Sequence, residues 1–195
     1  MVEQLIEDSY NYLEEHPEAI DACQDFISEG YSVNEDYDKG NMTDTITLLL
    51  RAIVSVSTKQ PIKVYRGMNE NRYAFYKQLQ EGESITVNRF TSTSLIQRIA
   101  EQHAEMQSDT PGTYITILIP EGQPAFFLNT VNDLPGGAIY GISRQVELLI
   151  DNVDGYEVAT LDGDTGYANG EEEVLLGPGT FTCINQGSAF EYRSV

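Results

Sequence analysis

Apolar residues recur at helical spacing over the first part of the chain. The pattern begins at Val2 and continues to residue 28, and Pro17 divides it into two predicted helices. The tract 30–41 is polar and predicts a loop. A strongly apolar segment follows, and we expect a third helix over 43–57 with a capping Thr or Asp at its start.

After residue 60 the pattern changes to short segments, most of which have the character of strands. We expect strands over 61–68, 84–95, 113–122 and 125–130, a strand or short helix over 145–152, and a last strand after the turn-rich tract 161–170. Helices are expected over 71–82 and 96–106. Helices that precede a run of short strands are typical of an α+β fold. We therefore expect an N-terminal helical region, 1–60, that packs on a core, 61–195, within one compact domain.

The formal net charge of −20 over 195 residues is the strongest compositional feature. It opposes non-specific binding to nucleic acid, because phosphates would be repelled. The acidic residues are concentrated at the start of the chain, where residues 1–40 hold twelve Asp and Glu and a single lysine. Such a surface is compatible with a basic protein partner, and it is equally explained by solubility alone.

Neither a membrane span nor a metal site is expected. No apolar run approaches the length that crosses a bilayer, and the acidic N-terminus does not have the basic start of a secretory signal, which favours a cytoplasmic protein. Cys23 and Cys183 lie far apart in sequence, which favours two reduced thiols over a disulfide. His16 and His103 are also far apart, and no EF-hand spacing is present.

Three glutamates in a row precede an apolar strand in GEEEVLLGPGTF, residues 170–181. In a strand, residues two apart share a face, so Glu171 and Glu173 are expected side by side with Glu172 pointing away. Like charges this close repel. They are therefore either part of a very acidic surface or a pair that acts together.

Two further segments carry polar groups that could serve a site. In VYRG, residues 64–67, Arg66 stands within an apolar strand, where its charge must be paired or used, and Gly67 would let a ligand approach the backbone closely. In FTSTS, residues 90–94, three hydroxyls are clustered at the end of a strand. Taken singly, a structural salt bridge and ordinary strand-end hydroxyls explain these segments.

In this order and spacing, the three segments resemble the Arg, Ser-Thr-Ser, Glu-x-Glu signature of the mono-ADP-ribosyltransferases. The resemblance covers residues 61–184 and is greatest for the bacteriophage enzymes of the Alt and Mod type. It implies a core of two packed mixed or antiparallel sheets. It also implies transfer of ADP-ribose from NAD, as substrate, to an arginine of a host protein, without a metal.

The resemblance assigns roles residue by residue. Glu173 would stabilise the charge that develops on the ribose, and Glu171 would receive the arginine. Ser92 would hold Glu173 and the ribose. Arg66 would contact the NAD phosphates or ribose, and the backbone of Gly67 would contact the nicotinamide amide. Thr93 and Ser94 would shape the pocket. Tyr167 has two open readings, contact with the protein substrate or an ordinary loop tyrosine.

A second Gln-x-Glu pattern, from Gln145 to Glu147, competes with the glutamate run and would imply a different acceptor. We prefer 171–173 because a Pro-Gly turn follows it. Arg89 and Arg98 flank the Ser-Thr-Ser segment and either reach the pyrophosphate or form surface salt bridges, of which we favour the latter. For the adjacent Phe126 and Phe127, core packing is favoured over stacking on nicotinamide.

Three functions compete for this sequence: a protein-arginine transferase, an NAD glycohydrolase with the same pocket, and a non-enzymatic acidic module that binds a basic partner. For the transferase, RNA polymerase is one expected target, and a phage-encoded enzyme would act in the host cytoplasm and could be carried in the virion. The acidic helices of residues 1–60 have two open roles, packing on the back of the core or selecting a basic target.

Overall fold

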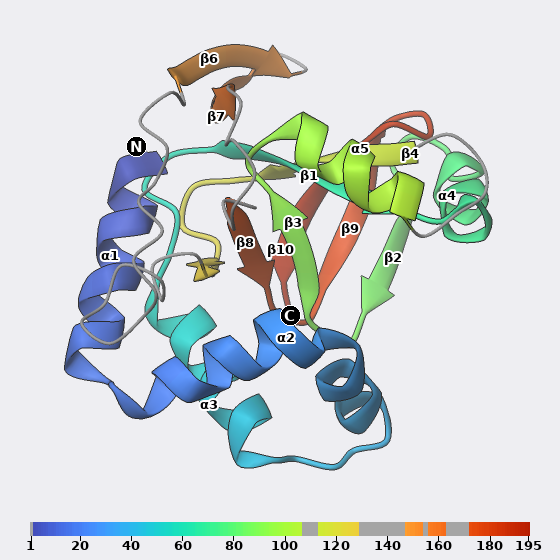
Figure 1. The fold of residues 1–195 in the computed structure, drawn as a ribbon. Coiled ribbons are helices and arrows are strands. Elements are labelled where there is room, and N and C mark those ends of the chain that lie inside the picture. The colour runs from blue at the N-terminus through green and yellow to red at the C-terminus, as the bar shows by residue number, and fades with distance from the viewer. Residues whose placement is uncertain (1, 107–112, 129–146, 154–155, 163–171) are drawn as a thin grey trace.

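The computed structural model describes residues 2–106, 113–128, 147–153, 156–162 and 172–195 (Figure 1). The helices are α1 (Val2–Glu15), α2 (Glu18–Asp38), α3 (Asp44–Ser55), α4 (Glu70–Lys77) and α5 (Gln97–Met106). The strands are β1 (Ile62–Met68), β2 (Ser84–Val87), β3 (Thr91–Ser94), β4 (Thr113–Ile119), β5 (Phe126–Phe127), β6 (Glu147–Val153), β7 (Tyr156–Asp162), β8 (Glu173–Leu176), β9 (Gly179–Asn185) and β10 (Ala189–Ser194). The α+β class expected from the sequence is confirmed.

The strands follow the order β2-β9-β10-β4-β1-β3-β8-β5, and β7 pairs with both β1 and β6. Most neighbours are antiparallel, whereas β10 is parallel to β4 and β7 is parallel to β1. A single residue pair, Tyr65 with Ser94, joins β1 to β3. The mixed sheet thus has two parts, a large one that contains β1 and a small one made of β3, β8 and β5, and the candidate motifs stand on both sides of their junction.

The predicted break at Pro17 is confirmed, but the loop expected over 30–41 is wrong, because α2 continues to Asp38. The helix is kinked at Glu29, whose φ of −132° is not helical. Tertiary contacts hold the polar second half in place. Asn34 donates a hydrogen bond from Nδ2 to the carbonyl oxygen of Phe90 (3.2 Å), and its Oδ1 accepts one from the Phe90 amide (2.9 Å). The ring of Tyr37 stacks on the Phe90 ring at 5.2 Å.

The continuous strand expected over 84–95 is also wrong. Its two halves are β2, which pairs with β9, and β3, which pairs with β1 and β8. The segment 145–152, left open between strand and helix, contributes β6, and the neighbouring strand β7 was not anticipated. The third helix is capped as expected, since the hydroxyl of Thr43 accepts a hydrogen bond from the amide of Ile46 (3.3 Å).

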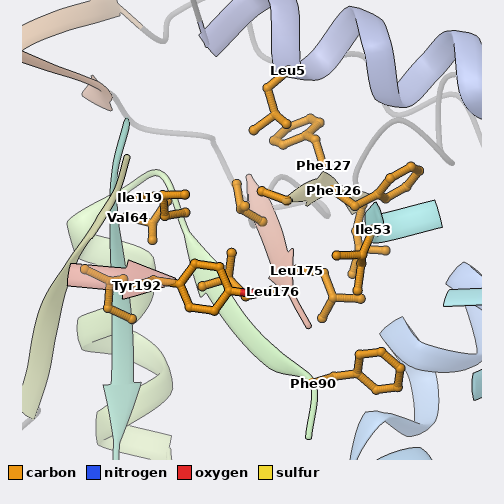
Figure 2. Close-up of a cluster of buried hydrophobic side chains, with 14 of the residues drawn as sticks. Leu5, Ile53, Val64, Phe90, Ile119, Phe126, Phe127, Leu175, Leu176 and Tyr192 are labelled. Atoms are coloured by element: carbon orange, nitrogen blue, oxygen red, sulfur yellow. The ribbon is translucent and has the colours of Figure 1, made fainter. Parts of the chain in front are cut away.

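The helices of residues 1–60 share one hydrophobic core with the strands. Figure 2 shows Leu5 of α1 beside Phe127, and Ile53 of α3 beside Phe126 and Leu175. Both phenylalanines are fully buried, which confirms core packing as their role. The core further includes the buried, free thiols Cys23 and Cys183, as expected for two reduced cysteines. In the described ranges, no helix has the length and apolar character needed to cross a membrane.

Candidate active site

A cavity of about 370 Å³ opens between α2 and the junction of the two parts of the sheet. Arg66 of β1, Ser92 of β3 and Glu173 of β8 line one side of it, and α2 lines the other. A smaller cavity of about 100 Å³ adjoins it and shares four residues with it: Arg66, Arg72, Ser92 and His103. The three segments singled out in the sequence therefore meet at one place, although 22 residues or more separate each from the next.

Strand pairing explains why the hydroxyl segment and the glutamate lie together. The antiparallel register of β3 with β8 sets Ser94 opposite Glu173 and Ser92 opposite Leu175. Opposite residues of such a pair share a face, and so do residues two apart, which puts Ser92, Ser94 and Glu173 on the same face. Glu173 is only 6% exposed, so its carboxylate is held close to the core.

The three hydroxyls of the Ser-Thr-Ser segment have different surroundings. Thr93 is buried, and its hydroxyl donates a hydrogen bond to the carbonyl oxygen of Val174 (2.7 Å), which ties β3 to β8. Ser94 is buried too, and its Oγ accepts a hydrogen bond from the amide of Ile96 (3.0 Å), at the entrance to α5. Ser92 is exposed and lines both cavities. All three residues line the smaller cavity, and Ser92, the most exposed of them, is the one that also lines the larger cavity.

The glutamate run departs from the expected strand geometry. Glu172 precedes β8 and has a φ of +44°, in the left-handed region that non-glycine residues rarely adopt. The alternation of faces does not extend through such a residue, and Glu172 is 2% exposed rather than pointing away. The expectation for Glu172 is therefore wrong. Glu171 lies outside the described residues, as does Tyr167.

Helix α2 lies near the glutamate, since Phe26 and Ile27 line the larger cavity together with Glu173. Burial and, to a smaller extent, the negative charge of Glu173 together raise the pKa of the Cys23 thiol to about 12. The same helix contributes the exposed side chains of Ile27 and Tyr31 to the rim of the larger cavity. Packing of the acidic helices on the back of the core is thus wrong for α2, which forms a wall of the site.

Three arginines line the larger cavity, out of eleven Lys and Arg in a chain of net charge −20. Burial is the main cause that lowers the pKa of Arg66 to about 10, and the charges of Arg72 and Arg89 lower it as well, against an opposing contribution from Tyr76. Within the described part of the chain, neither Arg66 nor Arg72 forms an ion pair. A cluster of mutually repelling guanidinium groups is a site that an anion would stabilise.

Arg89 has a partner at the mouth of the cavity. Its Nη2 lies 3.0 Å from Oδ2 of Asp38 in α2, and both side chains are about 40% exposed. The surface salt bridge favoured for Arg89 is confirmed, yet the same side chain lines the cavity. Arg98 is absent from the lining of both cavities.

Gly67 is required by the packing of the protein itself. A Cβ at this position would overlap the carbonyl oxygen of Ala100 and lie 2.9 Å from the amide nitrogen of Ala104, both in α5. The close approach expected at this glycine is therefore made by a helix backbone, while the residue also lines the smaller cavity. Gly67 sets the distance between α5 and β1, and with it the width of the site.

The competing Gln-x-Glu pattern lies elsewhere in the sheet. Glu147 begins β6, whose only strand partner among the described residues is β7, whereas β8 pairs with the Ser-Thr-Ser strand. Gln145 lies outside the described residues. The sequence analysis did not anticipate the lining residues of α2, nor Arg72 on α4 and His103 on α5. Neither Arg72 nor His103 belongs to a motif, and only the packing of their helices against β1 and β4 brings them to the site.

Comparison with known protein families shows the family to which the chain belongs. The family model described as ADP-ribosyltransferase exoenzyme matches residues 10–192, and the chain therefore belongs to this family. No relative was found among curated protein sequences. The family defines the class of activity as ADP-ribosyl transfer, and NAD is the substrate that such enzymes use.

Solved structures of bacterial toxins have the same fold. Plx2a, an ADP-ribosyltransferase toxin from Paenibacillus larvae, is 14% identical, with a TM-score of 0.56 over 97% of this chain and 92% of Plx2a. The Vibrio splendidus ADP-ribosyltransferase Vis, in complex with agmatine, is 17% identical, with a TM-score of 0.50 over 98% of this chain and 83% of Vis. The Clostridium perfringens toxin component BECa, solved with NADH, is 14% identical, with a TM-score of 0.55 over 96% of this chain and 46% of BECa. At these identities the likeness establishes the fold.

Proposed function

We propose that the protein transfers ADP-ribose from NAD to an arginine side chain of a host protein. The observation that carries this proposal is the meeting of Arg66, Ser92 and Glu173 around one cavity, across the junction of β1, β3 and β8. Its volume of about 370 Å³ lies within the range of small-molecule sites. The arginine cluster beside it fits the negatively charged diphosphate of NAD.

NAD supplies the reactive bond, between the nicotinamide nitrogen and C1′ of the ribose. Nicotinamide leaves with the bonding electron pair, a guanidino nitrogen of the acceptor bonds to C1′, and that nitrogen gives up one proton. Positive charge develops on the ribose as in glycoside hydrolysis, and the nearly buried carboxylate of Glu173 would stabilise it. Ser92, on the same face, would orient the ribose, and Arg66, Arg72 and Arg89 would hold the diphosphate.

The choice of arginine as acceptor rests on Glu171. A guanidinium is protonated at neutral pH, so a carboxylate must orient it and take its proton as the new bond forms. Vis, which has the same fold, was solved with agmatine, whose guanidinium group resembles that of arginine. This likeness supports a guanidinium acceptor here, and agmatine is therefore a suitable small acceptor for testing the protein.

The expected kinship with bacteriophage enzymes remains a proposal, as does RNA polymerase as the target. The similar structures named above are bacterial toxins, which makes an animal-cell protein the alternative target. Incubation with labelled NAD in lysates of bacteria and of animal cells, side by side, distinguishes the two. Labelled bands confined to the bacterial lysate would support a phage-type enzyme.

The test of the activity uses agmatine as acceptor and measures both nicotinamide release and formation of ADP-ribosyl-agmatine. We expect Glu173→Gln to lower both by at least about 10²-fold, the usual cost of removing a group that stabilises transition-state charge. Glu147→Gln, in the competing pattern, is the matched control and should leave both rates unchanged. Glu171→Gln should abolish transfer and retain nicotinamide release.

The other outcomes identify the competing functions. Nicotinamide release without transfer in the wild type would indicate an NAD glycohydrolase. The loss of activity in Glu147→Gln but not in Glu173→Gln would overturn the assignment of the site. No NAD turnover in any variant would leave an acidic module that binds a basic partner.

A further inference from the structure

The wall shared by the two cavities contains one side chain to which the proposed reaction gives no role. Arg66 comes from β1, Arg72 from α4 and Ser92 from β3, and the fourth member is His103 of α5. Imidazole is the side chain whose ordinary pKa, about 6.5, lies closest to neutral pH. Among the described residues that line either cavity, His103 is the only histidine.

The packing of α5 on β1 and the hydrogen bond at the start of α5 fix the position of the helix that carries His103. Ala100 and Ala104 are buried, and their backbone atoms meet the side of β1 where Gly67 has no side chain. The start of α5 is fixed by the hydrogen bond from the amide of Ile96 to Ser94. His103 directly precedes Ala104 and is half-buried, so the packing of α5 on β1 places this residue in the lining of both cavities.

Charged groups of both signs line the cavities beside His103. Arg66, Arg72 and Arg89 contribute positive charge from β1, α4 and the segment before β3, whereas Glu35 and Asp38 of α2 and Glu173 of β8 contribute negative charge. On α5 itself, Glu101 and Glu105 are the acidic neighbours. A bound diphosphate would add negative charge beside His103, and negative charge favours the imidazolium form.

We propose that His103 binds the diphosphate of NAD as an imidazolium, so that NAD binding is coupled to proton uptake at this residue. The inference rests on the proposed function, because it takes NAD as the ligand of the cavity. His103 would act as a binding residue, next to the arginines, that strengthens NAD binding below neutral pH. A histidine that only packs α5 against β1 would not respond to the ligand.

The chain contains two histidines, which makes a direct measurement possible on the wild-type protein. Imidazole resonances are followed by NMR from pH 5.5 to 8.5, with and without NAD, and with inorganic pyrophosphate as the minimal diphosphate. We expect the titration midpoint of His103 to rise by about one pH unit with either ligand. His16, which lies in the turn before α2 and contacts Glu18 at 3.3 Å, is the internal control and should not move.

Binding of NAD to variants gives an independent readout, measured calorimetrically at pH 6 and pH 8. The wild type should bind NAD several-fold more tightly at pH 6, with a proton uptake that His103→Gln removes and His16→Gln retains. NAD binding with an unmoved His103 midpoint, or an unchanged pH dependence in His103→Gln, would overturn the inference alone. Failure of the wild type to bind NAD at all would instead overturn the proposed function.

Discussion

Replacement of Gly67 by alanine tests how the site is built, because a single methyl group must displace a helix. The new Cβ would overlap the Ala100 carbonyl oxygen and crowd the Ala104 amide nitrogen. Both are backbone atoms, so no side-chain rotation can relieve the contact, and α5 must move away from β1. Overpacking of this kind costs about 1–3 kcal/mol, and we expect a value near the upper end. For a chain of this length, that cost corresponds to a fall in Tm of about 6–12 °C.

Gly177→Ala is the matched control. Its Cβ would lie 3.6 Å from Cγ2 of Ile53, an ordinary van der Waals distance, so its Tm should stay within about 3 °C of the wild type. Differential scanning fluorimetry measures both Tm values, and calorimetry measures NAD binding to the folded variants. We expect weaker NAD binding in Gly67→Ala, because α5 takes His103 with it. Equal Tm values for the two variants would refute the inferred packing of α5 on β1.

Three further predictions follow from the contacts between the helices and the sheet. Asn34→Ala removes both hydrogen bonds to the Phe90 backbone and should lower the free energy of unfolding by about 2 kcal/mol in urea titration. Asn41→Ala, at an exposed amide, is the control and should change it by less than about 0.5 kcal/mol. Equal effects of the two variants would contradict the inference that Asn34 fixes α2 to Phe90. Burial raises the pKa of Tyr192 to about 12, so the folded state holds its proton where the unfolded state loses it. Stability should therefore fall by about 1.4 kcal/mol per unit as the pH rises from 10 to 12, and an equal fall in Tyr192→Phe would contradict this. The fragment 61–195 should not fold alone, since its core is completed by α1–α3; a cooperative thermal transition of the fragment would show otherwise.

The parts of the site that depend on local sequence were predictable. Strand β1 could be located from its apolar run, and the break at Pro17 from the missing amide hydrogen. The order of the Arg, Ser-Thr-Ser and Glu-x-Glu segments led to the ADP-ribosyltransferases, and the family model of ADP-ribosyltransferase exoenzymes matches residues 10–192. These features need only the period of a strand or helix, or the identity of a few residues.

The parts that depend on distant contacts were not predictable. The second half of α2 is polar and contains Gly30, and its helical state is supported by Asn34 and Tyr37 packing on Phe90, more than 50 residues away. Glu172 adopts a left-handed φ that no pattern of polar and apolar residues indicates. Arg72 reaches the cavity only through the placement of α4. Sequence periodicity says which face of an element is buried, but not which other element covers it.

The most direct test of the central claim is transfer of label from adenine-labelled NAD to proteins in bacterial and animal-cell lysates, with the wild type, Glu173→Gln and Glu147→Gln side by side. The cavity assignment predicts discrete labelled bands with the wild type and with Glu147→Gln, and none with Glu173→Gln. Labelling that survives Glu173→Gln would contradict the proposal that the Glu173 carboxylate carries the reaction.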